Sequence, residues 1–184
     1  MSEAAQKLAK KGVCVMEPGL TDAEFARVEQ DFGFEFADDH RAVLATALPV
    51  DRDARHTWPD WRDGDPAALR AQLDRPVDGV LFDVERNGFW HRGWGERPVD
   101  VRERLEAARE ELAKVPRLVP IYAHRFLPAG RGTSGHPVLS VHQTDLIYYG
   151  ADLLDYIERE FGYVPNWSEG WDPQATVPFW SELL

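Results

Sequence analysis

The clearest pattern in the chain is an apolar residue at every third or fourth position, the spacing of a helix with one buried face. It is sharpest from Thr21 to Gly33. The apolar positions there are Phe25, Val28 and Phe32. Thr21 and Glu24 form a capping box, which satisfies backbone donors at a helix start, and Gly33 is a typical helix end. The sequence therefore predicts a helix between residues 21 and 33.

Several further segments show the same helical spacing. Helices are expected within residues 1–16 and over residues 38–48, 65–76, 77–84, 100–116 and 151–161. Pro76 is expected to close the third of these, because a proline inside a helix removes a hydrogen bond. The next segment has apolar residues at helical spacing, although a strand of the same composition remains an alternative.

Two segments instead alternate apolar and polar residues, which is typical of strands. They run from Ile121 to Leu127 and from Pro137 to His142, and the Gly-rich sequence PAGRGTSG lies between them. The expected fold class is α+β, with several helices packed around a small, mainly antiparallel sheet that includes this hairpin. We expect the helix at residues 151–161 to cover the sheet.

Length and charge narrow the class of protein. A chain of 184 residues suits one domain, with residues 1–16 as a candidate additional N-terminal segment. Its 32 acidic residues against 21 Lys and Arg give a net charge of -11, which disfavours nucleic acid and anionic membranes and favours basic partners. The alternative is that the acidity only keeps the protein soluble.

Cysteine usage and the lack of long apolar runs point to the cytoplasm. The lone Cys14 cannot form an internal disulfide, and its neighbours are apolar, as expected for a packed thiol in a reducing compartment. No run approaches the roughly 20 apolar residues that span a bilayer, and the N-terminus lacks a signal-like apolar core. We therefore expect a cytoplasmic protein without a membrane segment.

The histidines around the Gly-rich turn raise the question of a metal site. His124, His136 and His142, with Asp145, could supply ligands for a metal-dependent hydrolase. Their separations match no known metal motif, and histidines in hairpins more often bond to a neighbour or to water. The sequence therefore favours a protein that has no metal, no cofactor and no catalytic residues, with the hydrolase as the alternative.

Aromatic residues in loops are the candidates for contact with a protein partner. The chain has seven tryptophans, more than a core of this size ordinarily needs, and tyrosine and tryptophan are enriched in interfaces. The candidate contact residues are Trp58, Trp61, Asp63, Trp90, Trp94, Asp145, Tyr148 and Tyr149. For all of the aromatic residues, packing in the core is the open alternative.

Two acids in the segment FDVERNGFW are not expected to act as a catalytic pair. On a helix, side chains two positions apart point in nearly opposite directions, which separates Asp83 from Glu85. We expect instead that they bond to nearby backbone or to arginines such as Arg86.

Several stretches, taken in order, resemble the bacterial SUKH superfamily, which includes relatives of the fungal Smi/Knr cell-wall assembly regulators. They are LTDAEFARVEQDFGFEFADDHRAVLATALP at residues 20–49, DGVLFDVERNGFWHRGWGERP at 78–98, and GHPVLSVHQTDLIYYG followed by ADLLDYIEREF at 135–161. The resemblance covers most of the chain and omits the first sixteen residues and the region around residues 167–176.

This resemblance implies a protein-binding module, because many bacterial members are immunity proteins that neutralise a secreted toxin. The leading hypothesis is therefore an immunity protein that binds and occludes a toxin domain, its acidic surface meeting a basic partner. Besides the hydrolase, a regulatory scaffold without a toxin partner is an alternative.

Overall fold

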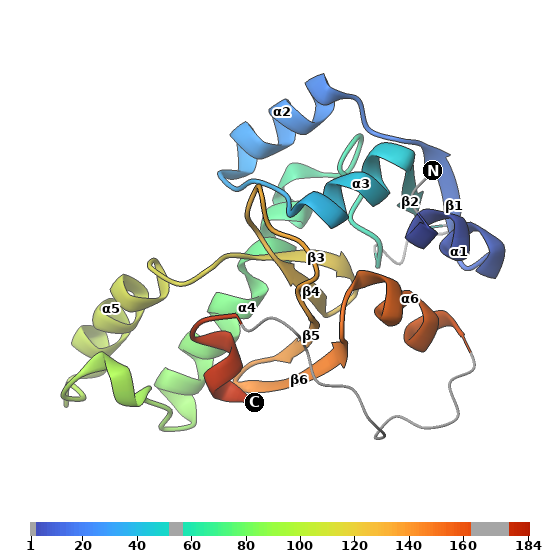
Figure 1. The fold of residues 1–184 in the computed structure, drawn as a ribbon. Helices are drawn as coiled ribbons and strands as arrows, with labels where there is room; N and C mark the ends of the chain where they lie inside the picture. The colour runs from blue at the N-terminus through green and yellow to red at the C-terminus, as the bar shows by residue number, and fades with distance from the viewer. Residues whose placement is uncertain (1–2, 52–56, 163–176) are drawn as a thin grey trace.

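The computed structural model describes residues 3–51, 57–162 and 177–184 and has an α+β fold. Its centre is a four-stranded antiparallel sheet in which each strand pairs with the next along the chain (Figure 1). The strands are β3 (Leu118–Tyr122), β4 (Arg125–Pro128), β5 (Val138–His142) and β6 (Asp145–Gly150). The predicted fold class is thus confirmed.

Helices cover both faces of this sheet, because its strands carry apolar side chains on alternate sides. Phe126 and Leu139 pack on one face with α4 (Pro66–Arg86), α5 (Val101–Leu112) and the C-terminal 3-10 helix η2 (Trp180–Leu183). Leu127 and Val138 pack on the other face with α1 (Glu3–Lys11) and α6 (Leu153–Phe161). The expectation that the helix at residues 151–161 covers the sheet is therefore confirmed.

The N-terminal part builds a second layer above the sheet (Figure 1). It contains β1 (Val15–Pro18), α2 (Asp22–Phe32), α3 (Asp38–Thr46) and β2 (Ala47–Val50), and β1 pairs with β2 in antiparallel fashion. Helix α2 has the predicted capping box between Thr21 and Glu24 and ends at Gly33, whose φ of 69° lies in the left-handed region. Local sequence signals alone account for this helix.

Two expected helix boundaries are wrong. Pro76 does not close a helix, since it lies buried inside α4, which is 21 residues long. Proline removes one backbone bond, but the buried Leu73, Val80 and Val84 anchor α4 on both sides of it. Helix α3 ends at Thr46, because the next residues pair with β1 as a strand.

The expected two-stranded hairpin is also wrong in detail. The segment predicted as one strand, residues 121–127, contains the end of β3, a two-residue turn at Ala123 and His124, and most of β4. A second two-residue turn, at Gln143 and Thr144, joins β5 to β6. Neither turn contains glycine, although Ala123 and Gln143 have positive φ angles of 51° and 57°. The usual sequence signal for a tight hairpin is therefore absent.

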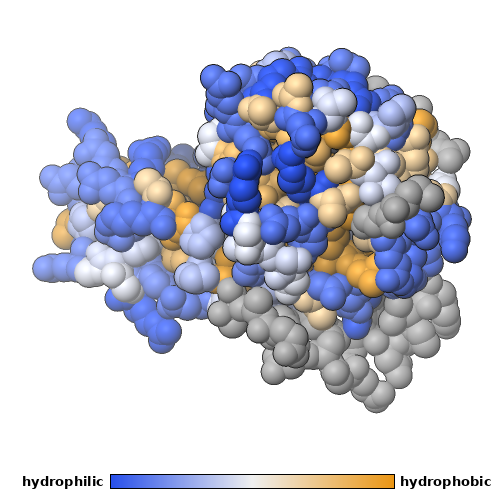
Figure 2. Space-filling view, turned by 45° about the horizontal axis from the view of Figure 1, so that its top comes forward, coloured by the Kyte–Doolittle hydropathy of each residue, from blue (hydrophilic) through white to orange (hydrophobic). Residues whose placement is uncertain are grey.

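An arm projects from this body. It consists of the loop that follows α4, which contains the 3-10 helix η1 (Arg92–Trp94), and of α5 (Figure 1). Figure 2 shows that hydrophilic side chains cover much of the arm, with apolar surface where it meets the body. Ala108 and Leu112 of α5 are buried at this junction in the cluster that includes Val80 and Val84 of α4.

His40 of α3 is buried in the N-terminal layer. Its ring meets the ring of Phe36 edge-on, with centroids 5.2 Å apart. Burial disfavours the charged imidazolium and lowers the pKa of His40 from the ordinary value of 6.5 to about 3.

Stability should therefore fall as the solution is acidified. The unfolded chain takes up a proton at His40 near pH 6.5, whereas the folded chain resists protonation until about pH 3. The contribution of neutral His40 to the stability of the fold is complete above pH 6.5 and is lost progressively as the pH falls from 6.5 to 3. Urea unfolding should show a loss of about 2 kcal/mol between pH 7 and pH 5. A His40→Phe variant that keeps the same pH slope would contradict this assignment.

Candidate functional site

The structure places Trp58 and Trp61 in the core, which corrects the expectation that they contact a partner. Trp61 is 2 % exposed, and its ring lies 5.5 Å from that of Phe36. Trp58 is also buried and stacks on Phe161 at 5.5 Å. Both indoles point inward and pack in the hydrophobic clusters between the layers. Asp63 of the same loop remains exposed.

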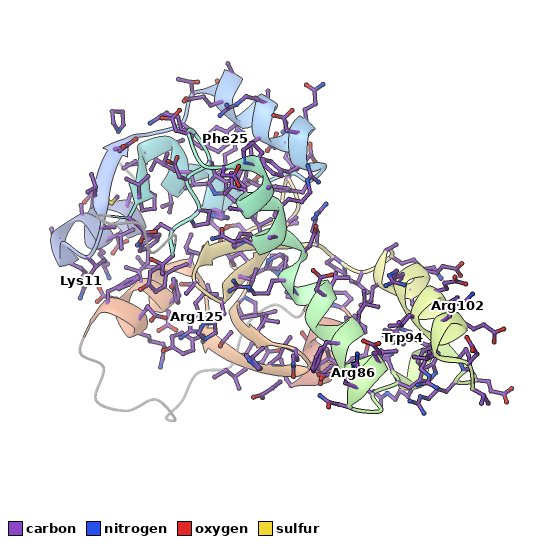
Figure 3. The ribbon with its side chains drawn as sticks, turned by 180° about the vertical axis from the view of Figure 1, so that it is seen from behind. Lys11, Phe25, Arg86, Trp94, Arg102 and Arg125 are labelled. Carbon is purple, nitrogen blue, oxygen red and sulfur yellow. The ribbon has the colours of Figure 1, made fainter. Side chains whose placement is uncertain are left out.

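Trp90 and Trp94 lie on the arm and are half-buried. Trp94 stacks on Phe179 with centroids 5.8 Å apart and planes within 8°, and Trp90 meets Trp94 edge-on at 5.1 Å. The Trp90 indole nitrogen donates to the carbonyl of Gly95 at 3.0 Å. In Figure 3, Trp94 lies on the projecting side of the molecule near α5, whereas Arg125 lies on the strands beyond α4. Both tryptophans therefore have fixed positions with part of each side chain accessible.

We call residues 89–101 the arm loop. Beyond the tryptophans it carries two exposed valines, Val99, which is 94 % exposed, and Val101. The guanidinium of Arg104 on α5 donates to the carbonyls of Pro98 at 3.1 Å and Val99 at 2.8 Å. The arm loop thus presents apolar side chains on a backbone that is held in place.

The other predicted contact residues lie on β6. Tyr149 is half-buried beneath the guanidinium of Arg125, which lies 3.7 Å from its ring centroid. Tyr148 packs against the cluster between the sheet, α4 and α5, and its hydroxyl lies 3.5 Å from that of Ser181. Packing therefore accounts for both tyrosines, and Asp145 is the exposed member of the predicted trio.

Only two of the three turn histidines come together. His124 and His142 lie in or beside the two tight turns at one end of the sheet, where the amide of Val141 donates to the carbonyl of His124 at 3.0 Å. His136 lies at the other end, next to Gly135, whose amide donates to Asp39 of α3. No three His, Cys, Asp or Glu side chains in residues 3–51, 57–162 and 177–184 are arranged to hold a metal ion.

The two histidines line an open groove of about 560 Å³ between α4 and the two turns. We call it the turn groove. Its functional side chains are Arg75, Asp78 and Phe82 of α4 with His124, His142 and Gln143 of the turns. The three residues of α4 have no recognisable signal in the sequence, because they have the spacing of an ordinary solvent-facing side of a helix.

Close contacts fix the turns against α4. A side-chain carbon added at Gly79 would lie 2.8 Å from the Cα of Gln143, so only glycine permits this approach. The buried carboxylate of Asp83 accepts from the backbone amide of Thr144 at 2.9 Å and from its hydroxyl at 2.6 Å. The predicted structural role of Asp83, bonding to nearby backbone, is therefore confirmed. The expected pairing of Glu85 with Arg86 is present at 3.3 Å.

Positive charge acts on His124 in the turn groove. Partial burial is the main cause that lowers the pKa of His124, and the charges of Arg125, Arg75 and His142 add to it. No carboxylate is among the groups that shift it. The groove therefore has a cationic end beside the turns, although the chain as a whole is acidic.

Comparison of the chain with protein-family models, with curated proteins and with solved structures finds no match. In the part of the chain that the structure describes, no helix has both the length and the apolar character needed to cross a membrane.

Proposed function

We propose that this chain is a protein-binding module of the immunity type, which neutralises a bacterial toxin by binding and covering it. The proposal rests on the resemblance of its sequence to SUKH proteins and on the arm loop. The observation that carries it is a pair of exposed valines, Val99 at 94 % and Val101 at 45 %, that follow two fixed, half-exposed tryptophans on a projecting arm.

Such a surface suits a protein interface for two reasons. Large aromatic side chains that are already held in place lose little entropy on binding, so more of their contact energy remains as affinity. Exposed valines add apolar area that a partner can remove from water. Exposed charged residues of both signs lie in and next to the arm loop around these apolar side chains, as expected for the polar rim of an interface. They include Arg92, Glu96, Arg97, Arg102 and Glu103.

The net charge favours a basic partner. At -11, the acidic surface would accelerate encounter with a basic toxin domain, an effect that salt weakens. Affinity would come mainly from apolar contacts at the arm loop. We place this interaction in the cytoplasm, where an immunity protein meets a toxin made in the same cell.

Co-expression with the products of neighbouring reading frames, followed by pull-down and calorimetry, tests this proposal. A Val99→Asp variant should fold normally, because Val99 packs against nothing, and should bind the captured partner about tenfold or more weakly. Val13→Asp is the matched control, because Val13 is also exposed but lies between α1 and β1. Equal affinities for the two variants would exclude the arm loop, and the absence of any complex would exclude a neighbouring toxin.

A further inference from the structure

We propose that the turn groove binds an extended segment of a partner protein in which a carboxylate side chain lies three positions from an apolar side chain. None of the groove residues belongs to the arm loop. This inference therefore stands independently of the proposed immunity function.

The first argument is the guanidinium of Arg75, which has no carboxylate partner and lies beside two imidazoles whose nitrogens can also donate to one. In the described part of the chain, Arg75, His124 and His142 form no ion pair, and Arg75 only donates to the carbonyl of Ala123 at 3.4 Å. By contrast, Arg117 and Arg125 each pair with a carboxylate at 3.0 Å. In a chain with 32 acidic residues, an unpaired guanidinium beside two imidazoles can accept a carboxylate supplied by a ligand.

The carboxylates near this end do not occupy the cationic site. Asp78 lines the groove one helical turn beyond Arg75, toward Phe82, and forms no ion pair within the described residues. Asp145 follows the second turn, where its backbone pairs in register with His142. Neither carboxylate is among the groups that shift the pKa of His124, whereas the charges of Arg125 and Arg75 add to the effect of burial in lowering it.

The second argument is an apolar contact at the other end of the groove. Phe82 is 46 % exposed, whereas the other large apolar side chains of α4 are buried or half-buried. It lies two turns after Arg75, or about 10 Å along the helix axis at 1.5 Å per residue. A ligand that covered Phe82 would remove this apolar area from water.

This separation defines the spacing in the ligand. In a polyproline II segment, side chains three positions apart lie on the same side, about 9 Å from each other. One such segment could place a carboxylate at Arg75 and an apolar side chain on Phe82. Asp78 between them would repel a second carboxylate, so the intervening positions should be uncharged.

The groove is also rigid before a ligand arrives. Gly79 packs directly on Gln143, Thr144 is bonded to the buried Asp83, and Arg75 holds the first turn. A preformed site loses less entropy on binding, which matters for a short ligand with few contacts.

Nuclear magnetic resonance titration of the full chain tests the proposal. The probes are acetyl-Glu-Pro-Pro-Leu amide and the reversed acetyl-Leu-Pro-Pro-Glu amide, with Gln replacing Glu as the uncharged comparison. We expect one order to shift the amide signals of His124, His142 and Gln143 saturably. Arg75→Gln should weaken its binding about tenfold, and Phe82→Ser about fivefold. The control Arg102→Gln, at another exposed arginine without an ion pair in the described residues, should leave it unchanged.

Several results would overturn the proposal. They are the absence of saturable shifts for both orders, equal affinity of the Glu and Gln peptides, and equal affinities of Arg75→Gln and Arg102→Gln. Inorganic phosphate is the last probe. If it caused the same shifts with the same affinity as the peptide, the groove would recognise negative charge alone, and a peptide ligand would be excluded. Val99→Asp should bind the peptide like the wild type, which separates this test from that of the arm loop.

Discussion

Replacement of Trp61 by alanine is expected to lower the free energy of unfolding by about 3–5 kcal/mol. The indole is 2 % exposed and is surrounded by the rings of Phe32, Phe34 and Phe36, all with centroids within 5.9 Å. These rings belong to α2 and the segment after it, so a cavity at Trp61 would loosen the packing of the whole N-terminal layer. Urea unfolding followed by circular dichroism measures the change.

Trp90→Ala is the matched control for this prediction. Trp90 is half-buried and bonded only through its indole nitrogen to the arm loop itself, so its loss should cost less than about 2 kcal/mol. Equal destabilisation by the two variants would mean that the arm loop belongs to the core. The comparison also serves the binding experiments. If Trp61→Ala weakens binding to a partner, the cause would be unfolding of the N-terminal layer and not the loss of a direct contact.

The sequence predicts well those elements whose boundaries depend on local chemistry. Helix α2 is the best example, because Thr21, Glu24 and Gly33 satisfy its backbone groups without help from other segments. Helix α6 likewise begins at the cap of Asp152 and lies where it was expected. The α+β class follows from the same local patterns.

Elements that depend on distant contacts were not predictable in this way. Pro76 is a local signal for a helix end, yet the packing of α4 against the sheet on both sides of the proline outweighs it. The two tight turns lack glycine, and the adjoining α4 and Asp83 hold the second of them. A pattern read along the chain carries no information about such neighbours.

In the candidate sites too, local sequence identifies some residues and only the fold identifies the others. Loop tryptophans could be identified from the sequence, but only the fold separates the buried Trp58 and Trp61 from the accessible Trp90 and Trp94. The turn groove combines α4 with turns that lie more than forty positions later. Its α4 residues therefore have no recognisable signal in the sequence. The histidines do have one, but it indicates a metal site, which the described residues do not form.

Asp83→Ala should lower the free energy of unfolding by about 3–4 kcal/mol. Asp83 is 4 % exposed. Its carboxylate accepts from the backbone amide and the hydroxyl of Thr144 and from the side-chain amide of Asn87 at 2.5 Å. Its removal leaves the two donors of Thr144 and the side-chain amide of Asn87 without this charged acceptor, and leaves a small cavity beside α4. Asp78→Ala on the same helix is the control and should change stability by less than about 0.5 kcal/mol, because Asp78 is exposed.

The same substitution distinguishes positioning from packing at the turn groove. Without Asp83, the turn that carries His142 and Gln143 loses its attachment to α4, so peptide binding should weaken even under conditions where the protein stays folded. Hydrogen exchange at the Thr144 amide reports this directly, since that proton should exchange much faster in Asp83→Ala than in Asp78→Ala. If it exchanges equally slowly in both variants, then Asp83 does not hold the turn, and the rigidity of the groove must come from the close approach of Gly79 to Gln143.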